Sequence, residues 1–393
     1  MSKHADVQVD IVICGGGVAG LWLLARLRQQ GYQAILIELS KLGSGQTRYA
    51  QGIIHGGTKY ALTGAVSGSS EAIAAMPALW RDCLAGSGEI DLRAAKLLSR
   101  HQYLWSTAGL TSRMAGFFAS KLMRSRIEPL TSSDYPAVFR HEQFLGQVYS
   151  LEEPVLDTAS LLHALAQPHE NFIWHAQVRQ IDGLCLSLVN GDRQINISTK
   201  QIVLTAGRGN AGLLRLLGRD TPRMQTRPLK MVMLRGDLPT GVYAHCLGAS
   251  SNPRITISSH TDIHGRSVWY LGGELADAGV MRSDAEQLSA ARKELSELLP
   301  WLDINGCDFA VLDIDRAEPQ MSGGRRPDDV YVEQHDGVIT AWPTKLAFAP
   351  RLAMRVLELL QQAQINPAAA NELPNWDFPG YALLPWQEEE RWS

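Results

Sequence analysis

The segment VQVDIVICGGGVAGLWLLARLRQQGYQAILIE, residues 7–38, decides the fold. Its first eight residues are mostly apolar and β-branched, which is typical of a strand buried on both faces. Three glycines follow, then a helical stretch from Val18 to Gln30 that stops at Gly31. A second apolar run extends from Ala34 to Glu38. This order predicts a strand, a glycine loop, a helix and a parallel strand, which together form one βαβ unit.

The glycines in this unit have the spacing G-x-G-x-x-G, at Gly15, Gly17 and Gly20. The first permits a tight turn, the second lets a pyrophosphate approach the backbone, and the third lets helix and strand pack closely. Glu38 ends the next strand, where a carboxylate can accept hydrogen bonds from a ribose and repel a 2′-phosphate. The pattern predicts a dinucleotide site, and a purely structural glycine turn is the alternative.

A second match to this spacing occurs at Gly207, Gly209 and Gly212, directly after the apolar run 201–205. No strand ending in Asp or Glu follows at the required distance. We therefore expect this segment to close the sheet beside the first nucleotide, in preference to forming a second nucleotide site.

The rest of the chain alternates βαβ pieces with a β-rich stretch, 228–275, whose hairpin turn is predicted at His264-Gly265. Helices are predicted near 71–85, 110–126, 283–299 and 347–364, and Asp157-Thr158 predicts the cap of a further helix that runs to about Gln167. The pattern predicts an α/β protein in which a Rossmann-like domain is interleaved with a β-rich α+β substrate domain. The predicted divisions are 1–80, 146–220 and 325–366 for nucleotide binding, 81–145 and 221–324 for the substrate, and 367–393 as a tail.

Composition narrows the function classes. The 393 residues have a net charge of −3, which argues against a nucleic-acid binder. Five scattered cysteines without a C-x-x-C disfavour a disulfide framework or a zinc site and fit a cytoplasmic protein. No metal site is predicted. The tail contains three tryptophans, for which packing on the same chain is the favoured interpretation and docking on a protein or a membrane surface the alternative.

Two observations favour FAD over NAD. The loop from Leu42 to Tyr60 is polar and glycine-rich without a predicted helix, which suits an extended cofactor. The strand turn at Thr205-Ala206-Gly207 recurs far downstream of the first βαβ unit, so the nucleotide domain is discontinuous.

Three blocks identify a family resemblance: GQTRYAQGIIHGGTKY (45–60), VLTAGRGNAGLL (203–214) and WPTKLAFAPRLAMRVLELL (342–360). With DRAEP (315–319) and SGGRRPDDVY (322–331), they resemble FAD-dependent oxidoreductases of the D-amino-acid oxidase superfamily. The resemblance is nearest the branch of glycerol-3-phosphate dehydrogenase and L-2-hydroxyglutarate oxidase. Trp342-Pro343 stands where the family usually has two glycines, and Lys59 where the glycerol-phosphate enzymes usually have arginine.

The resemblance implies hydride transfer to a flavin from a C–H bond that bears a hydroxyl or an amine. The residues expected to contact FAD are Gly15, Gly17, Val18, Ala19, Gly20, Glu38, Leu39, Ser44, Gly45, Gln46, Thr47, Gln51, Gly52, Ile53, Val178, Thr205, Ala206, Gly207, Thr344, Lys345 and Leu346.

His55 is the candidate base or polar orienter, because an imidazole with a pKa of about 6.5 suits proton transfer at neutral pH. The alternative is a histidine that bonds the loop backbone or the flavin. The candidate anion clamp consists of Lys59, Arg316, Arg325 or Arg326, and Lys345. Arginine pairs bidentately with a carboxylate or phosphate. Surface salt bridges with Asp313, Asp328 or Asp329 are the alternative for the arginines.

The sequence thus predicts an FAD-dependent dehydrogenase or oxidase that acts on a small anionic substrate, a 2-hydroxy acid or a polyol phosphate. An amine or amino-acid oxidase, or a flavoprotein that acts mainly as a partner in an assembly, are the alternatives. Oxygen, a quinone and a protein are all left open as the electron acceptor.

Overall fold

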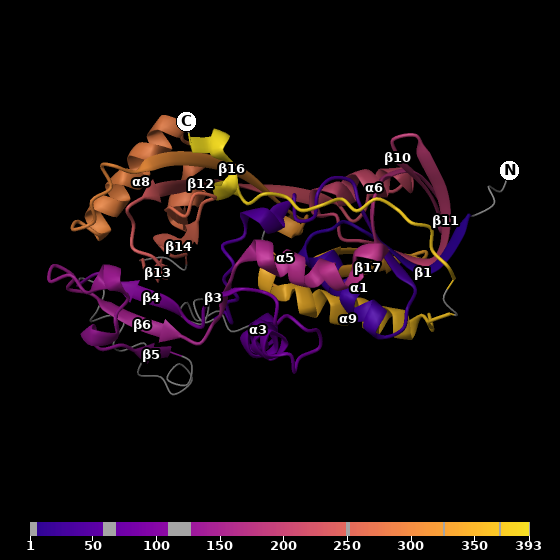
Figure 1. Cartoon of the computed structure of the whole chain (residues 1–393), viewed down its shortest axis with the longest axis horizontal. Helices are drawn as coiled ribbons and strands as arrows, with labels where there is room; N and C mark the ends of the chain where they lie inside the picture. The colour runs from indigo at the N-terminus through magenta and orange to yellow at the C-terminus, as the bar shows by residue number, and fades with distance from the viewer. Residues whose placement is uncertain are drawn as a thin grey trace.

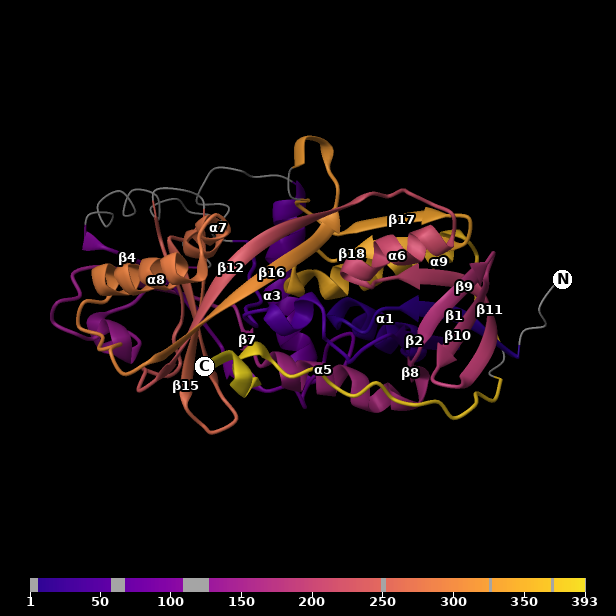
Figure 2. The same cartoon turned by 90° about the horizontal axis from the view of Figure 1, so that it is seen from above.

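A computed structural model describes residues 6–57, 68–108, 127–248, 252–324, 327–368 and 371–392. In this part of the chain two lobes each contain an eight-stranded sheet (Figure 1). The long strands β12 (Met224–Gly236) and β16 (Asp308–Pro319) pair along their length and extend from one lobe towards the other (Figure 2). Both α and β elements contribute to the two lobes, so the predicted α/β class is confirmed.

The first sheet has the order β17-β18-β11-β1-β2-β8, with β10 paired to β11 and β9 paired to β10. Its strands are β1 (Val7–Cys14), β2 (Ala34–Glu38), β8 (Ile173–His175), β9 (Gln177–Asp182), β10 (Cys185–Asn190), β11 (Arg193–Leu204), β17 (Tyr331–His335) and β18 (Val338–Trp342). Strand β1 is parallel to β2 and to β11, and α1 (Val18–Gln29) connects β1 to β2. The predicted βαβ unit is therefore confirmed, and β11 closes the sheet beside it.

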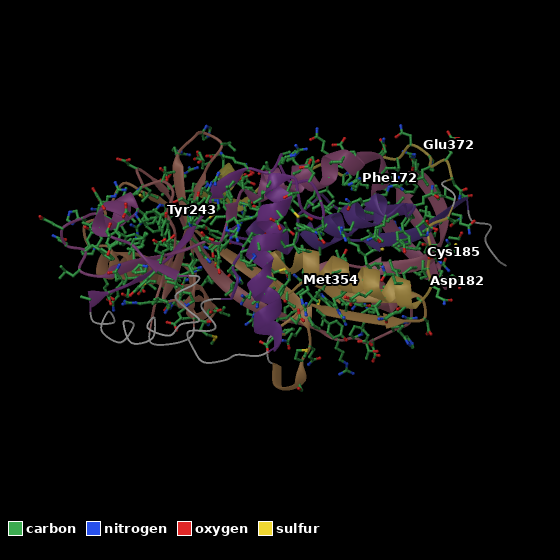
Figure 3. The ribbon with its side chains drawn as sticks, turned by 90° about the horizontal axis from the view of Figure 1, so that it is seen from below. Phe172, Asp182, Cys185, Tyr243, Met354 and Glu372 are labelled. Carbon is green, nitrogen blue, oxygen red and sulfur yellow. The ribbon has the colours of Figure 1, made fainter. Side chains whose placement is uncertain are left out.

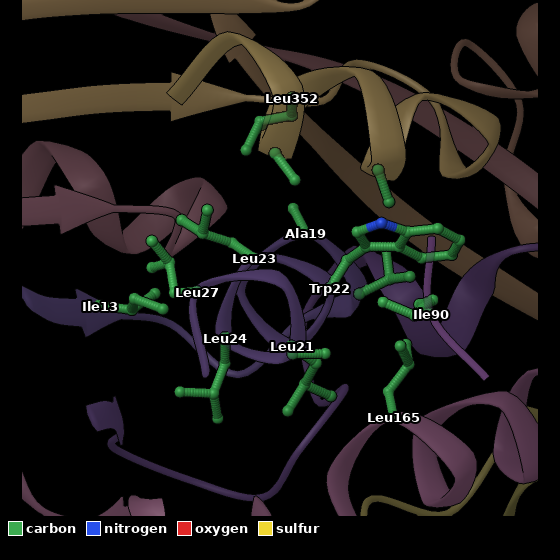
Figure 4. Packing of buried hydrophobic residues seen from close by; sticks show 14 of the residues in the cluster. Ile13, Ala19, Leu21, Trp22, Leu23, Leu24, Leu27, Ile90, Leu165 and Leu352 are labelled. Carbon is green, nitrogen blue, oxygen red and sulfur yellow. The ribbon is translucent and has the colours of Figure 1, made fainter. Parts of the chain in front are cut away.

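Helix α1 is buried along most of its length between α9 (Ala349–Gln362) and α5 (Thr158–Ala166). Trp22 and Leu23 of α1 lie on the side of Leu352 from α9, whereas Leu21 of α1 and Leu165 of α5 lie on the side away from Leu352 (Figure 4). The predicted cap of α5 is present, because Asp157 accepts a hydrogen bond from the backbone of Ser160. This packing holds the glycine loop at the N-terminus of α1 in place.

The second sheet has the order β16-β12-β15-β14-β13-β4-β6-β5. Its remaining strands are β4 (Gln102–Ser106), β5 (Ile127–Pro129), β6 (Gln147–Leu151), β13 (Tyr243–Cys246), β14 (Ile255–Thr261) and β15 (Ser267–Gly272). Strands β14 and β15 form the hairpin predicted at His264-Gly265. Helices α7 (Glu274–Gly279) and α8 (Asp284–Leu298) pack against this sheet.

The remaining α-helices and strands of the described ranges are α3 (Gly68–Ala85), the short pair β3 (Leu97–Ser99) and β7 (Val155–Leu156), and α6 (Asn210–Leu216). One predicted boundary needs correction: the sequence places residues 147–151 in the nucleotide-binding part, but β6 pairs with β4 and β5 in the second sheet. The predicted helix at 110–126 lies outside the described residues.

The C-terminal tail runs in extended form over both lobes (Figures 1 and 2). Trp376 stacks on Trp174, with ring centroids 5.5 Å apart, and Trp386 stacks on His260 at 3.7 Å. Trp386 and Trp392 are buried. The tail therefore packs on its own chain, as the favoured interpretation of its tryptophans predicted.

None of the five cysteines, all of which lie in the described ranges, forms a disulfide in this structure. Among the described residues we find no helix of the length and apolar character needed to cross a bilayer.

Candidate active site

The glycine loop between β1 and α1 packs directly on β11. Gly15 has a φ of +115°, a conformation that side chains rarely adopt, and lies against Thr205 and Ala206. A Cβ atom on Gly20 would overlap the carbonyl oxygen of Gly15 and lie 2.8 Å from the Thr205 hydroxyl. These two glycines have the steric roles predicted for the first and third positions of the motif.

Gly17 has different surroundings, because a Cβ atom there would meet only the Thr47 hydroxyl, at 3.2 Å. It is the N-cap of α1, whose first turn contains no acidic residue. Beside it, the Glu38 carboxylate accepts hydrogen bonds from the backbone N–H of Gly16 (2.6 Å) and of Ser40 (2.8 Å). An open helix N-terminus with a carboxylate at its edge fits the pyrophosphate and ribose of a dinucleotide.

A cavity of about 330 Å³ lies between the loop after β2, the second sheet and the segment after β18. Many residues predicted for FAD or substrate contact line its wall. They are Val18, Gln46, Thr47, Gln51, Gly52, Ile53, His55, Arg316, Thr344, Lys345 and Leu346. The cavity thus joins segments more than 260 residues apart in the chain, at the junction of the two lobes.

The loop that contains His55 is fixed to the chain around β7. The backbone N–H of Ile54 donates to the carbonyl of Pro154 at 2.9 Å, and that of Gly56 donates to the carboxylate of Glu153 at 2.6 Å. The His55 side chain therefore sits on an anchored backbone at the cavity wall.

Arg316 lies on β16 and lines the cavity, with its Nη2 atom 3.6 Å from Oδ1 of Asp277 in α7. Asp277 is not one of the salt-bridge partners that the sequence suggested for Arg316. Asp313 lies near Lys230, and Asp329 pairs with Arg351. Lys59, Arg325 and Arg326 fall outside the described residues, so their predicted roles stay predictions.

The segment after β18 makes a tight turn into the cavity. Thr344 has a φ of +61°, an unusual conformation for a residue with a side chain. Its hydroxyl donates to the carbonyl of Asp329 at 3.3 Å, and the Lys345 N–H donates to the carbonyl of Pro343 at 2.7 Å. The turn places Thr344, Lys345 and Leu346 on the cavity wall.

Other predicted FAD contacts lie away from the cavity. Leu39 is 63% exposed beyond the end of β2, and the partly buried Val178 packs against the core of the first lobe. Ala19, Ser44, Gly45 and Gly207 lie in or near the glycine loop and its neighbouring segments. Their contacts with the cofactor stay predictions.

Sequence reasoning missed a polar part of the wall, to which strands β12, β13 and β14 of the second sheet, helix α7, the segment before β14 and the loop after β2 contribute. The missed residues with polar side chains are Tyr49, Arg227, His245, Asn252, Thr256 and Asp277. A signal was present in β12, where Arg227, Leu229 and Met231 alternate with residues of the opposite face and all three reach the cavity. The alternation shows which residues share a face, but only the pairing of the strands shows that this face lines the cavity.

Burial keeps two groups near the site, the Cys14 thiol and the Tyr270 phenol, protonated at neutral pH. Burial, together with the Glu38 carboxylate, raises the pKa of the Cys14 thiol to about 12, so this residue is no nucleophile at neutral pH. Burial also raises the pKa of Tyr270 far above its usual value. Within the described ranges, no three His, Cys, Asp or Glu side chains come together to hold a metal ion.

Comparison with known proteins shows the family to which the chain is similar. Residues 10–348 match the family described as FAD dependent oxidoreductase, DAO. A curated relative, "Probable FAD-dependent oxidoreductase PA4991" from Pseudomonas aeruginosa, is 46% identical over 97% of this chain and 98% of its own length. The crystal structure of PA4991 aligns with a TM-score of 0.85 over 98% of both chains, at 41% identity.

More distant structures share the fold alone. Glycine oxidase from Geobacillus kaustophilus aligns with a TM-score of 0.64 at 17% identity, over 93% of this chain and all of its own. Glycerol-3-phosphate dehydrogenase from Bacillus halodurans, complexed with FAD, aligns with a TM-score of 0.61 at 15% identity, over 93% of this chain and 67% of its own. The glycerol-3-phosphate dehydrogenase branch is therefore a distant structural neighbour, not the near relative that the sequence blocks suggested.

Proposed function

This chain belongs to the FAD-dependent oxidoreductase family, and we propose that it transfers hydride from a small anionic substrate, a 2-hydroxy acid or a polyol phosphate, to FAD. The observation that carries the proposal is the position of Arg316, in a cavity bounded by the predicted flavin-contacting loop and the second sheet. A guanidinium at a partly enclosed wall suits a carboxylate or a phosphate.

Bound FAD would act as the hydride acceptor, and residues of this chain would bind the substrate, orient it and accept its proton. Arg316 holds the anionic group, which orients the neighbouring C–H bond. As hydride leaves that carbon, the hydroxyl loses its proton to His55, and a carbonyl product forms. Lys345, from the segment after β18 that also lines the cavity, supplies positive charge towards the substrate or the flavin carbonyl edge.

An amino acid is a second candidate substrate, and one observation favours it. Asp277 lines the same cavity beside Arg316, so the wall offers an acidic and a basic group together. Such a pair suits the ammonium and carboxylate of a zwitterion. Glycine oxidase, one of the structures with the same fold, is named for an amino-acid substrate.

Anaerobic titration of the FAD-loaded protein with a panel of hydroxy acids, glycerol phosphates and amino acids separates these candidates, because a substrate bleaches the flavin. Failure of every compound to reduce the flavin would favour the role of a partner in an assembly. Reoxidation by oxygen, a quinone or a protein then identifies the acceptor.

Truncation of Arg316 tests the anion contact directly. Arg316→Ala should lower kcat/KM by roughly 30- to 1000-fold, since it removes a charge-assisted bond in a partly dehydrated cavity. The matched control is Arg208→Ala, which removes an exposed arginine paired with Asp315 and should change kcat/KM little. Equal activity of both variants would contradict the proposed role of Arg316.

A further inference from the structure

A chain of buried hydrogen bonds connects the flavin-contacting loop to the substrate side of the cavity. It begins at Glu153, which follows β6 and is 5% exposed. One carboxylate oxygen, Oε1, accepts a hydrogen bond from the backbone N–H of Gly56, next to His55. The other, Oε2, accepts one from Nε2 of Gln102, a buried residue of β4.

The chain continues through the second sheet to the cavity wall. Oε1 of Gln102 lies 2.8 Å from Nε2 of His245 on β13. Nδ1 of His245 lies 2.7 Å from the hydroxyl of Thr256 on the neighbouring strand β14. His245 and Thr256 both line the cavity, and each is only 4% exposed.

The carboxylate at the start of the chain fixes the direction of every bond. An ionised carboxylate only accepts, so Gln102 must turn its NH2 group to Glu153 and its oxygen to His245. The Nε2 atom of His245 must then carry the proton that Gln102 accepts. In a neutral ring the Nδ1 atom is an acceptor, so it receives the hydroxyl hydrogen of Thr256.

The Thr256 hydroxyl has one hydrogen, and this chain uses it. Its oxygen keeps the capacity to accept a further bond. The polar part of the wall formed by His245 and Thr256 therefore offers an acceptor to a ligand in the cavity.

We propose that Glu153 is a positioning residue which, through Gln102 and His245, makes the Thr256 hydroxyl a hydrogen-bond acceptor, so that the site selects ligands that bring an N–H or O–H donor to that wall. The inference rests on the proposed function in one respect, that the substrate binds in the cavity lined by Arg316. It narrows the substrate class to anions whose polar group near the anionic end retains a hydrogen.

Two nearly isosteric carboxylates test this preference with the FAD-loaded full chain. Pyrrole-2-carboxylate presents a ring N–H where 2-furoate presents a ring oxygen, and binding of each is followed by the change in flavin absorbance. The wild type should bind pyrrole-2-carboxylate roughly tenfold more tightly. Thr256→Ser should keep this preference, whereas Thr256→Val should bring the two dissociation constants within about twofold of each other.

Glu153→Gln should reverse the preference from a position outside the cavity wall. The amide introduced by this substitution would keep its oxygen towards Gly56 and present an NH2 group to Gln102. The Gln102 amide and the His245 tautomer would then turn round, which frees the Thr256 hydroxyl to donate towards the furan oxygen. Glu89→Gln is the control, because Glu89 pairs with Trp22 and Arg26 away from the cavity and should leave the preference unchanged.

The outcomes separate this inference from the proposed function. Arg316→Ala should weaken both ligands to the same extent. Arg316→Ala could instead leave the binding of both ligands unchanged while Thr256→Val still makes their dissociation constants equal. The proposed anion contact of Arg316 would then be wrong, but the acceptor role of the wall formed by His245 and Thr256 (the acceptor wall) would stand. The acceptor wall is overturned if the wild type does not prefer pyrrole-2-carboxylate, or if Thr256→Val keeps the full preference. Equal weakening of both ligands by Glu153→Gln would indicate a structural role only and would overturn its positioning role.

Discussion

Gly17 and Gly20 belong to one glycine motif, yet a methyl group at each would meet different atoms. At Gly20 it would overlap the backbone oxygen of Gly15, so the loop or the helix would have to move. At Gly17 it would meet only the Thr47 hydroxyl, in space that we assign to the pyrophosphate. Gly20→Ala should therefore lower the free energy of unfolding of the apoprotein by about 1–3 kcal/mol.

Gly17→Ala should leave the apoprotein within about 0.5 kcal/mol of the wild type and weaken FAD binding at least tenfold. Urea unfolding of the apoproteins and titration of each with FAD distinguish the two effects. Wild-type FAD affinity in a stable Gly17→Ala variant would contradict the assignment of this loop to the cofactor.

His260 makes stability depend on pH. Burial lowers the pKa of its imidazole to about 3, whereas an unfolded chain has a histidine pKa of about 6.5. Below about pH 6.5 the unfolded state binds the proton and the folded state does not, so stability falls as the pH decreases towards 3. This residue should contribute a slope of up to about 1.4 kcal/mol per pH unit.

The measurement is the free energy of unfolding between pH 5 and 7.5, for the wild type and for His260→Gln. The substitution also removes the stacking on Trp386, so the absolute stability falls, but the slope is the informative quantity. An unchanged slope in His260→Gln would show that other groups cause the pH dependence.

At the scale of elements, the start of helix α8 is stabilised by a capping box, a pattern that can be recognised in the sequence. The Ser283 hydroxyl accepts from the backbone of Glu286, and the Glu286 carboxylate accepts from the backbone of Ser283. Ser283→Ala should cost about 1 kcal/mol of stability. Ser296→Ala, at an exposed position of the same helix, should cost less than about 0.5 kcal/mol, and thermal unfolding of both variants compares them.

The elements that sequence predicted well are those with local causes. The βαβ unit follows from the apolar runs and the glycine spacing, and α5 follows from its Asp157 cap. The second sheet has non-local causes: β13 is parallel to β4, about 140 residues earlier, and β6 pairs with β4 and β5. No local pattern reveals such pairing. The prediction that residues 147–151 belong to the nucleotide-binding part was therefore wrong.

The residues of the site also fall into those that local sequence motifs indicate and those that only the pairing of distant strands brings together. His55 and Lys345 lie in segments with recognisable motifs, and both were predicted to be near the substrate. His245 and Thr256 reach the wall only because their strands are neighbours in the second sheet. Asp277, which pairs with Arg316, comes from α7, and its local sequence contains no motif that indicates this contact.

At the scale of the whole molecule, the tail connects the two lobes and ends beside the loop after β2, which we propose as the flavin-contacting loop. Glu388 pairs with Arg48 and with Arg391, and Trp386 is buried against His260. Arg48 stands between Thr47 and Tyr49, which both line the cavity. The end of the tail therefore supports the wall on which we place the flavin.

Loss of this support should appear first in the cofactor. Glu388→Ala leaves the largely buried guanidinium of Arg48 without its carboxylate partner, which should cost about 1–3 kcal/mol and weaken FAD binding about tenfold. Glu372→Ala, at an exposed tail position near the other end of the molecule (Figure 3), should leave FAD binding unchanged. Quenching of flavin fluorescence on titration into the apoproteins gives both dissociation constants. If Glu388→Ala lowers the thermal stability but binds FAD as tightly as Glu372→Ala, the tail serves folding alone and does not position the flavin-contacting loop.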